Sequence, residues 1–292
     1  MTLPKIEDLV FKHLESLRAA EERAPSLLEG IPHANASSAG NCARLIGYRI
    51  AKAAESNPIT GDSLFNFSMG DHVHDQIQAA FCAVIPECQI EVNGKIEDFI
   101  TVRADLLYKT EEGKLVCGEI KSVSDFAYKL ATGVKLKSNG QWNKKGQTGE
   151  GPKREYVLQN GISARALGAD YLHVIYARKT AAKSEPIFAE FRFKIKDLDD
   201  KIDAEIARLK WIVDSIKKGI LPAREYEDEI IENPAKKNYP CGYCSYLETC
   251  SQMPSEAIPL NSMPKVVPGH LNRKEKSWDL KDTTTQGKSS CI

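Results

Sequence analysis

Apolar residues recur at helical spacing near the start of the chain. Leu9, Val10, Leu14 and Leu17 fall on one helical face, and Pro25 is expected to break or kink the helix. This pattern predicts a helix over 4–24. Apolar spacing, with glycine or proline stops at several ends, predicts further helices over 42–54, 68–84, 123–131, 153–168 and 198–218.

Short runs rich in valine, isoleucine and leucine lie between these helices and are typical of strands. Strands are predicted over 89–92, 100–108, 115–121, 171–177 and 186–193. Glu111-Glu112-Gly113 predicts a hairpin turn between the second and third of them. Helices, strands, a helix, more strands and a final helix predict an α/β fold, with a small mixed sheet flanked by helices.

The pattern also divides the chain into three regions. Residues 1–37 are predicted to be an N-terminal helical extension, and residues 38–252 form the main domain. From Met253 onward Pro, Ser, Thr and Lys dominate and apolar periodicity disappears. Residues 253–292 are therefore predicted to be a disordered tail.

Charge and composition limit the kind of partner. The chain has 40 Lys and Arg against 40 Asp and Glu, so its formal net charge is zero. A nucleic-acid site must therefore come from local clustering of basic residues. No apolar run approaches the roughly 20 residues that span a bilayer, and the first residues lack a signal-peptide layout. We expect an intracellular protein without a membrane partner, in the cytoplasm of a bacterial or phage-infected cell.

Charged residues lie in two neighbouring predicted strands. Glu119 and Lys121 are two positions apart, so they point to the same side of their strand. Asp105, on the preceding strand, can bring a second carboxylate to that side. Two carboxylates suit Mg²⁺ or Mn²⁺, and a neighbouring ammonium can orient the attacking water or offset charge in a transition state. A surface hairpin with solvated charges is the alternative.

His74 lies in the predicted helix upstream of these strands, four residues after Gly70. It can reach the carboxylates as a further metal ligand. An isolated histidine more often has a structural or surface role, so the argument for His74 rests on the residues that accompany it.

Eight cysteines in an intracellular protein are more consistent with metal or catalytic roles than with a disulfide framework. Cys241, Cys244 and Cys250 have the close spacing that grips one soft metal centre, and Cys42 is the best fourth ligand. Both zinc and a [4Fe–4S] cluster accept four thiolates, so this spacing leaves the two open. The other four are interpreted as unpaired, buried cysteines: Cys82, Cys88, Cys117 and Cys291.

Taken together, these residues resemble the RecB-like branch of the PD-(D/E)xK nucleases, and within it the iron–sulfur exonucleases. That branch includes CRISPR-associated RecB-like exonucleases, their viral relatives and the nuclease domain of AddB-type repair enzymes. The resemblance covers most of 38–252. It rests on the cysteines, on Arg44 and Tyr48 after Cys42, on the Gly-x-x-x-His pair, on the D…ExK signature, and on Tyr156 and Gln159 as a Tyr-x-x-Gln motif. The family often has an apolar or aromatic run after this glutamine, whereas Asn160-Gly161-Ile162-Ser163 follows here.

The resemblance implies catalytic roles for Lys121, Glu119, Asp105, Gln159 and Tyr156, the last two in positioning substrate. It implies Mg²⁺ or Mn²⁺ at His74, Asp105 and Glu119. It also implies a [4Fe–4S] cluster on the four cysteines that staples the fold, and cleavage of DNA, mainly single-stranded and from an end.

A basic segment over 129–154 is the candidate DNA-binding region. It holds Trp142, Lys144, Lys145, Lys153 and Arg154, together with further lysines and only one acidic residue. Basic residues with one aromatic suit a single-strand backbone with a stacked base. A solvated charge run is the plainer interpretation.

Three functional hypotheses remain at this stage. The first is a single-strand DNA exonuclease that acts in replication, recombination or repair, and this hypothesis includes an enzyme encoded by a phage. The second is a nuclease that processes DNA ends for CRISPR spacer acquisition, with integrase proteins as partners. The third is a non-catalytic, metal-stapled DNA-binding module. The sequence leaves the oligomeric state open.

Overall fold

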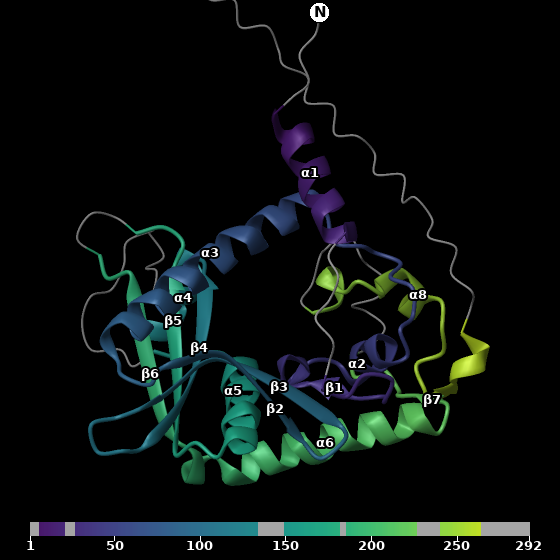
Figure 1. Ribbon diagram of the computed structural model, residues 1–292. Helices are drawn as coiled ribbons and strands as arrows, with labels where there is room; N and C mark the ends of the chain where they lie inside the picture. The colour runs from purple at the N-terminus through teal and green to yellow at the C-terminus, as the bar shows by residue number, and fades with distance from the viewer. Residues whose placement is uncertain (1–5, 21–26, 134–148, 182–184, 227–239, 264–292) are drawn as a thin grey trace, which may run out of the picture.

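The computed structural model describes residues 6–20, 27–133, 149–181, 185–226 and 240–263 (Figure 1). Its helices are α1 (Ile6–Ala20), α2 (Ala43–Ile50), α3 (Gly61–Val84), α4 (Asp125–Thr132), α5 (Arg154–Leu167), α6 (Asp199–Lys217) and α8 (Leu247–Ser251). Its strands are β1 (Ala34–Asn35), β2 (Gln89–Ile96), β3 (Ile100–Lys109), β4 (Leu115–Val123), β5 (Tyr171–Arg178), β6 (Phe188–Lys194), β7 (Ile220–Leu221) and β8 (Ile258–Pro259).

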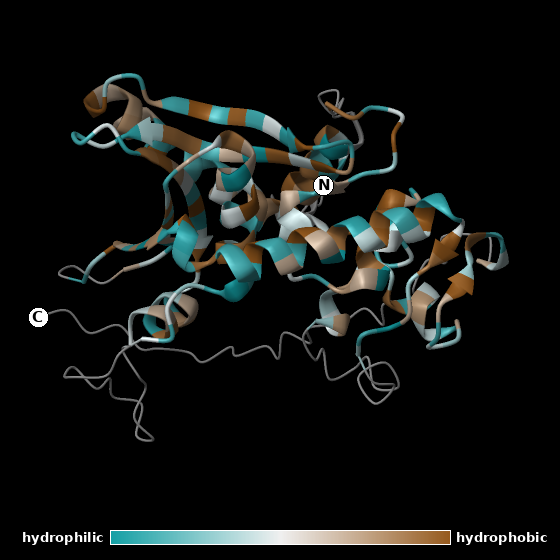
Figure 2. Ribbon diagram, turned by 90° about the horizontal axis from the view of Figure 1, so that it is seen from below, coloured by the Kyte–Doolittle hydropathy of each residue, from teal (hydrophilic) through white to brown (hydrophobic). Residues whose placement is uncertain are grey.

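The main sheet is mixed, as predicted. Its order is β1-β3-β4-β5-β6, and β2 pairs with β3 outside this path. Strands β3 and β4 form the antiparallel hairpin expected from the Glu111-Glu112-Gly113 turn, and β4 pairs in parallel with β5. Both hydrophobic and hydrophilic residues lie along the strands (Figure 2), and burial alternates along β6 but is almost continuous along β5. The α/β class with helices flanking a mixed sheet is therefore confirmed.

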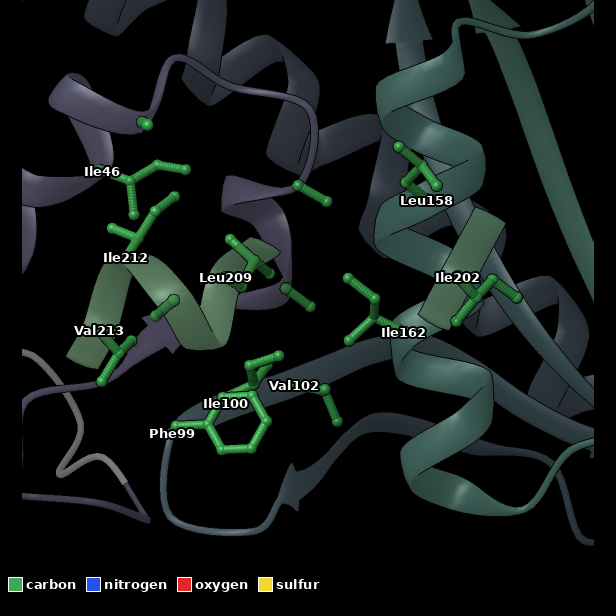
Figure 3. Close-up of a cluster of buried hydrophobic side chains, with 14 residues drawn as sticks. Ile46, Phe99, Ile100, Val102, Leu158, Ile162, Ile202, Leu209, Ile212 and Val213 are labelled. Atoms are coloured by element: carbon green, nitrogen blue, oxygen red, sulfur yellow. The ribbon is translucent and has the colours of Figure 1, made fainter. Parts of the chain in front are cut away.

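Two layers of helix cover the sheet. Helix α3 packs on the side of Leu106 and Ile120 through Ile77, whereas α5 packs on the other side, where Cys117 and Leu172 lie. Helix α6 lies against α5 and α2. The largest buried cluster joins α2, α5, α6 and the start of β3 (Figure 3), with Ile46, Ile100, Leu158, Ile162, Ile202, Leu209 and Ile212 among its members.

Helix α3 begins earlier than predicted, at Gly61 instead of residue 68. The reason is tertiary: α1 packs on this first part of α3. A Cβ at position 61 would collide with the side chain of Phe11, so the glycine permits the close approach. The N-terminal helix is thereby attached to the helix that carries His74.

The structure also places two region boundaries differently. Residues 34–35, assigned to the N-terminal extension, form β1 and pair with β3 of the main sheet. Residues from 253 onward, assigned to a disordered tail, include the buried Met253 and strand β8, which pairs with β7. Such pairing leaves no apolar period in the sequence, because two residues of strand are too short to show one. None of the described helices is long and apolar enough to cross a membrane.

Candidate active site and cysteine pocket

The candidate catalytic residues meet where β3 and β4 separate, a place called here the catalytic notch. Pairing between these strands runs from Lys109↔Leu115 to Leu106↔Gly118 and goes no further, while β4 continues along β5 to Val123. Asp105 stands just beyond the last pair. Its carboxylate accepts a hydrogen bond of 2.7 Å from the backbone N–H of Ile120. A side-chain oxygen therefore takes the place of the backbone carbonyl that continued β3–β4 pairing would have supplied.

Glu119, Lys121 and Gln159 form one connected group in the notch. Lys121 Nζ lies 2.5 Å from Glu119 Oε1, and it donates to Gln159 Oε1 at 3.3 Å. Gln159 Nε2 donates to the same Glu119 oxygen at 2.7 Å. The predicted shared side of Glu119 and Lys121 is confirmed, and α5 delivers Gln159 to it.

His74 reaches the notch from α3. Its Nδ1 lies 3.6 Å from Oδ2 of Asp105. Gln78, one turn later, donates to the backbone oxygen of Asp105 and to the carboxylate of Glu91, which holds α3 against β3. A Cβ at Gly70 would lie 3.9 Å from that of Ser122, an ordinary contact, so the backbone here does not depend on glycine.

Burial controls the electrostatics of the notch. Glu119 is 1% exposed, and this burial, reinforced by Asp105 and opposed by Lys121, raises its pKa to about 7. Burial likewise raises the pKa of Asp105, although the hydrogen bond from the Ile120 N–H and the neighbouring His74 both act to lower it. Burial alone would lower the pKa of Lys121, but the Glu119 carboxylate reverses this and leaves it raised, so the side chain remains an ammonium.

In the notch, Oε2 of Glu119 is buried and has no hydrogen-bond partner among the residues that the structure describes, which is costly for a carboxylate oxygen. A divalent cation bound there would satisfy it. In the described part of the chain, no three His, Cys, Asp or Glu side chains are grouped closely enough to hold a metal ion. The donor set of Asp105, Glu119 and His74 therefore suits Mg²⁺ or Mn²⁺ only with water or substrate oxygens completing the shell.

Tyr156 lies at the start of α5 with the basic residues Lys153 and Arg154, close to Lys121 of the notch. The ammonium of Lys121 lies 4.9 Å from the centre of the Tyr156 ring, and that of Lys153 lies 5.8 Å from it. Lys153 and Arg154 are exposed at the first turn of α5. Trp142, Lys144 and Lys145 lie outside the described residues.

Sequence reasoning missed the role of Asn160. This residue is fully buried, and its Nδ2 donates to the backbone oxygens of Cys117 at 3.1 Å and of His173 at 3.4 Å. It therefore fastens α5 to both β4 and β5 and holds Gln159 toward Glu119. A polar residue at the centre of an otherwise apolar helix face is the signal that could have revealed it.

Exposed aromatics near the notch were also missed. Phe65 and Phe67 on α3 and Phe126 on α4 are each about half exposed or more. Both helices meet the carboxyl end of β5: Arg178 pairs with Asp125 at the start of α4, and Lys179 Nζ donates to the backbone oxygen of Asn66 at 3.3 Å. We refer to these three exposed side chains as the aromatic rim: Phe65, Phe67 and Phe126.

The four predicted cluster ligands line one pocket. Cys42, at the start of α2, faces Cys241, Cys244 and Cys250 from the far end of the described chain, in a cavity of about 50 Å³. The fold therefore brings together the residues that the spacing grouped. Cys82, Cys88 and Cys117 form no disulfide and lie outside this pocket, as interpreted from the sequence. The expected burial is confirmed for Cys117 and wrong for Cys82, which is exposed, while Cys88 is partly buried. Cys291 lies outside the described residues.

Burial raises the pKa of Cys244 to about 11, partly offset by the backbone N–H of Tyr246, and burial also raises that of Cys241, with the neighbouring thiols adding to both shifts. Crowded, partly buried thiols of this kind stay protonated unless a cation takes the place of their protons. The donor set fits a soft metal centre on these grounds.

No protein-family model matches the chain, and no curated protein matches it either. Among solved structures, the crystal structure of SSO0001 aligns over 87% of this chain and 98% of its own, at 13% identity and a TM-score of 0.44. An alkaline exonuclease from Laribacter hongkongensis aligns over 64% of this chain and 93% of its own, at 13% identity and a TM-score of 0.37. The same exonuclease in complex with dAMP aligns with a TM-score of 0.36.

Proposed function

We propose that the protein is a metal-dependent deoxyribonuclease of the RecB-like PD-(D/E)xK type, with Asp105, Glu119 and Lys121 at its centre. The observation that carries this proposal is the buried Oε2 of Glu119, which has no hydrogen-bond donor among the described residues. The other oxygen of the same carboxylate, Oε1, lies 2.5 Å from the Lys121 ammonium, and a second carboxylate, that of Asp105, lies on the adjoining strand. A structural ion pair would be expected to satisfy both carboxylate oxygens. A cation site needs one of them free.

The chain's own residues divide the work. Asp105 and Glu119 would bind Mg²⁺ or Mn²⁺, with His74 as the third candidate ligand, and the bound cation would lower the pKa of its water and polarise the phosphate. Lys121 keeps its proton, so its role is to orient the attacking water and to offset charge on the phosphoryl oxygens. Gln159 holds both Glu119 and Lys121 at the required spacing.

The proposed substrate is single-stranded DNA, cut from an end. The aromatic rim supports this choice, because exposed rings can stack with bases that are not paired in a duplex. Lys153 and Arg154, exposed at the start of α5, supply charge for the backbone.

Cleavage of end-labelled DNA with Mn²⁺ tests the proposal. The wild-type protein should degrade single strands, and Asp105→Asn should not. Asp98→Asn is the control and should match wild type, because Asp98 is exposed in the β2–β3 turn, where its ion pair is with Lys95. Equal cleavage by wild type and Asp105→Asn would exclude this site. Binding without cleavage by the wild-type protein would favour the DNA-binding module instead.

The rim has its own test. The double variant Phe67→Ala/Phe126→Ala should weaken the binding of a single-stranded oligonucleotide by roughly tenfold or more, since stacking contributes about 1–3 kcal/mol per base. Trp211→Ala, which removes an exposed aromatic on α6, is the matched control. Equal binding by all three proteins would remove the rim from the substrate path.

We further propose that the four pocket cysteines hold a [4Fe–4S] cluster. All four line one cavity, and four thiolates are the ligand set of such a cluster. One zinc ion takes the same four thiolates, so metal content separates the two. Protein purified without oxygen should be brown and contain iron and sulfide. A colourless protein containing zinc would refute this assignment.

A further inference from the structure

Arg44 is a buried cation without a charged partner. It follows Cys42 by two positions, is 0% exposed and lines the cysteine pocket. Its guanidinium donates to four backbone oxygens: Pro222 at 2.8 Å, Pro254 at 2.6 Å, Ser255 at 3.2 Å, and Glu256. Among the residues that the structure describes, no carboxylate forms an ion pair with it.

This arrangement satisfies the hydrogen-bond donors but leaves the charge uncompensated. Carbonyl groups are neutral, and a buried charge is costly unless an opposite charge lies nearby. The pocket that Arg44 lines also holds the four cysteines, whose thiolates would supply the opposite charge. A cluster held by four thiolates carries net negative charge, and it would lie in the cavity that Arg44 lines.

We infer that Arg44 is the counter-charge of an anionic centre bound by Cys42, Cys241, Cys244 and Cys250. Its carbonyl partners lie just after β7 and just before β8. The same side chain therefore joins the centre to the segment 254–256, on the far side of the cysteines in the sequence. Arg44 is a positioning residue, and this inference rests on the proposed cluster but not on the proposed nuclease activity.

A change at Arg44 should alter the reduction potential of the cluster. Full-length protein would be purified without oxygen, and the midpoint potential would be measured by spectroelectrochemical titration for wild type, Arg44→Lys, Arg44→Gln and Arg49→Gln. Removing a nearby positive charge disfavours the reduced, more negative cluster. Arg44→Gln should therefore shift the ratio of reduced to oxidised cluster roughly tenfold, about 59 mV more negative for a one-electron couple.

The lysine variant separates charge from geometry. Lysine keeps the positive charge but cannot reproduce the four-carbonyl pattern, so Arg44→Lys should keep its iron and a potential near wild type. Arg49, exposed on the same helix, should have no effect. If Arg44→Gln fails to retain a cluster, iron per chain in Arg44→Lys decides the question: near-full occupancy supports the counter-charge, and loss equal to that of Arg44→Gln overturns it.

Two outcomes would overturn the inference in different ways. A brown protein whose potential is the same in Arg44→Gln and wild type would refute the role of Arg44 and leave the cluster in place. A protein without iron would refute both, and DNA cleavage assays would still report on the nuclease independently.

Discussion

The catalytic notch and the cysteine pocket are assembled in opposite ways. The notch is built on two adjoining strands and the helices on either face, and Glu119, Lys121 and Gln159 are already bonded to one another. The pocket joins Cys42 to cysteines from the far end of the described chain, and its thiols are crowded and partly buried. Strand pairing holds the residues of the notch in place, whereas the cysteines of the pocket come from distant segments and depend on a bound metal centre to link them.

This difference leads to different expectations for mutations. A change in the notch should remove chemistry and leave the fold intact, because strand pairing and packing hold the frame. A change in the pocket should weaken the fold, because a metal centre contributes folding free energy when its ligands come from distant segments. The four predictions below test this contrast.

Lys121→Met should have the largest effect. Losing the ammonium removes charge stabilisation at the reacting phosphate, so the cleavage rate should fall roughly 10³-fold, equivalent to about 4 kcal/mol. The protein should still fold, with a lower urea midpoint above pH 7, because the buried Glu119 carboxylate loses its counter-charge. Lys109→Met, on the exposed end of β3, is the control and should cleave as wild type does. A catalytically active Lys121→Met protein would mean that the notch is a structural ion-pair cluster.

Glu119 should make the metal-free protein less stable as the pH rises. Its pKa is raised from 4.5 to about 7, so its stabilising contribution is complete below pH 4.5 and is lost as the pH rises through about 7. Between pH 5 and pH 8, Glu119→Gln should gain on the order of 2 kcal/mol relative to wild type. Urea midpoints at the two pH values provide the measurement.

Two controls accompany this experiment. Glu112→Gln, in the exposed β3–β4 turn, should follow wild type at both pH values. Added Mn²⁺ should reduce the difference at pH 8 by binding the ionised carboxylate. Parallel behaviour of wild type and Glu119→Gln across this range would mean that Glu119 does not ionise there.

Cys241→Ser should reduce stability by about 2 kcal/mol and remove most of the bound iron, because one cluster ligand is lost. The measurements are iron per chain, visible absorbance and the urea midpoint of protein kept without oxygen. Cys82→Ser, exposed near the end of α3, should change none of these. Equal iron in both variants would show that the pocket does not bind the metal.

Gly70→Ala should have the smallest effect. There is room for the added methyl group, and alanine favours a helix over glycine by up to about 1 kcal/mol. Cleavage should stay within about twofold of wild type, and stability should be equal or slightly higher. A large loss of activity would show that α3 must come closer to β4 during the reaction than it does in this structure.

Local patterns were sufficient to predict much of the fold. The strands at 100–108 and 115–121, the turn between them and the helices around them match the observed elements closely. Side-chain alternation was enough to place Glu119 and Lys121 together, since a strand has a period of two. The start of α3 and residues 253–263, the described part of the predicted tail, differ from the prediction, because α1 and β7 stabilise them from elsewhere in the chain.

The sequence by itself determined which chemistry is available: two carboxylates and a lysine on neighbouring strands, a histidine upstream and four cysteines in two groups. Only the tertiary structure decided that β3 and β4 separate at Asp105, that one oxygen of Glu119 is left without a donor, that Asn160 fastens α5 to the sheet, and that Arg44 is buried beside the thiols. Burial and pairing between distant segments depend on how the whole chain packs, so the local periodicity of the sequence does not predict them.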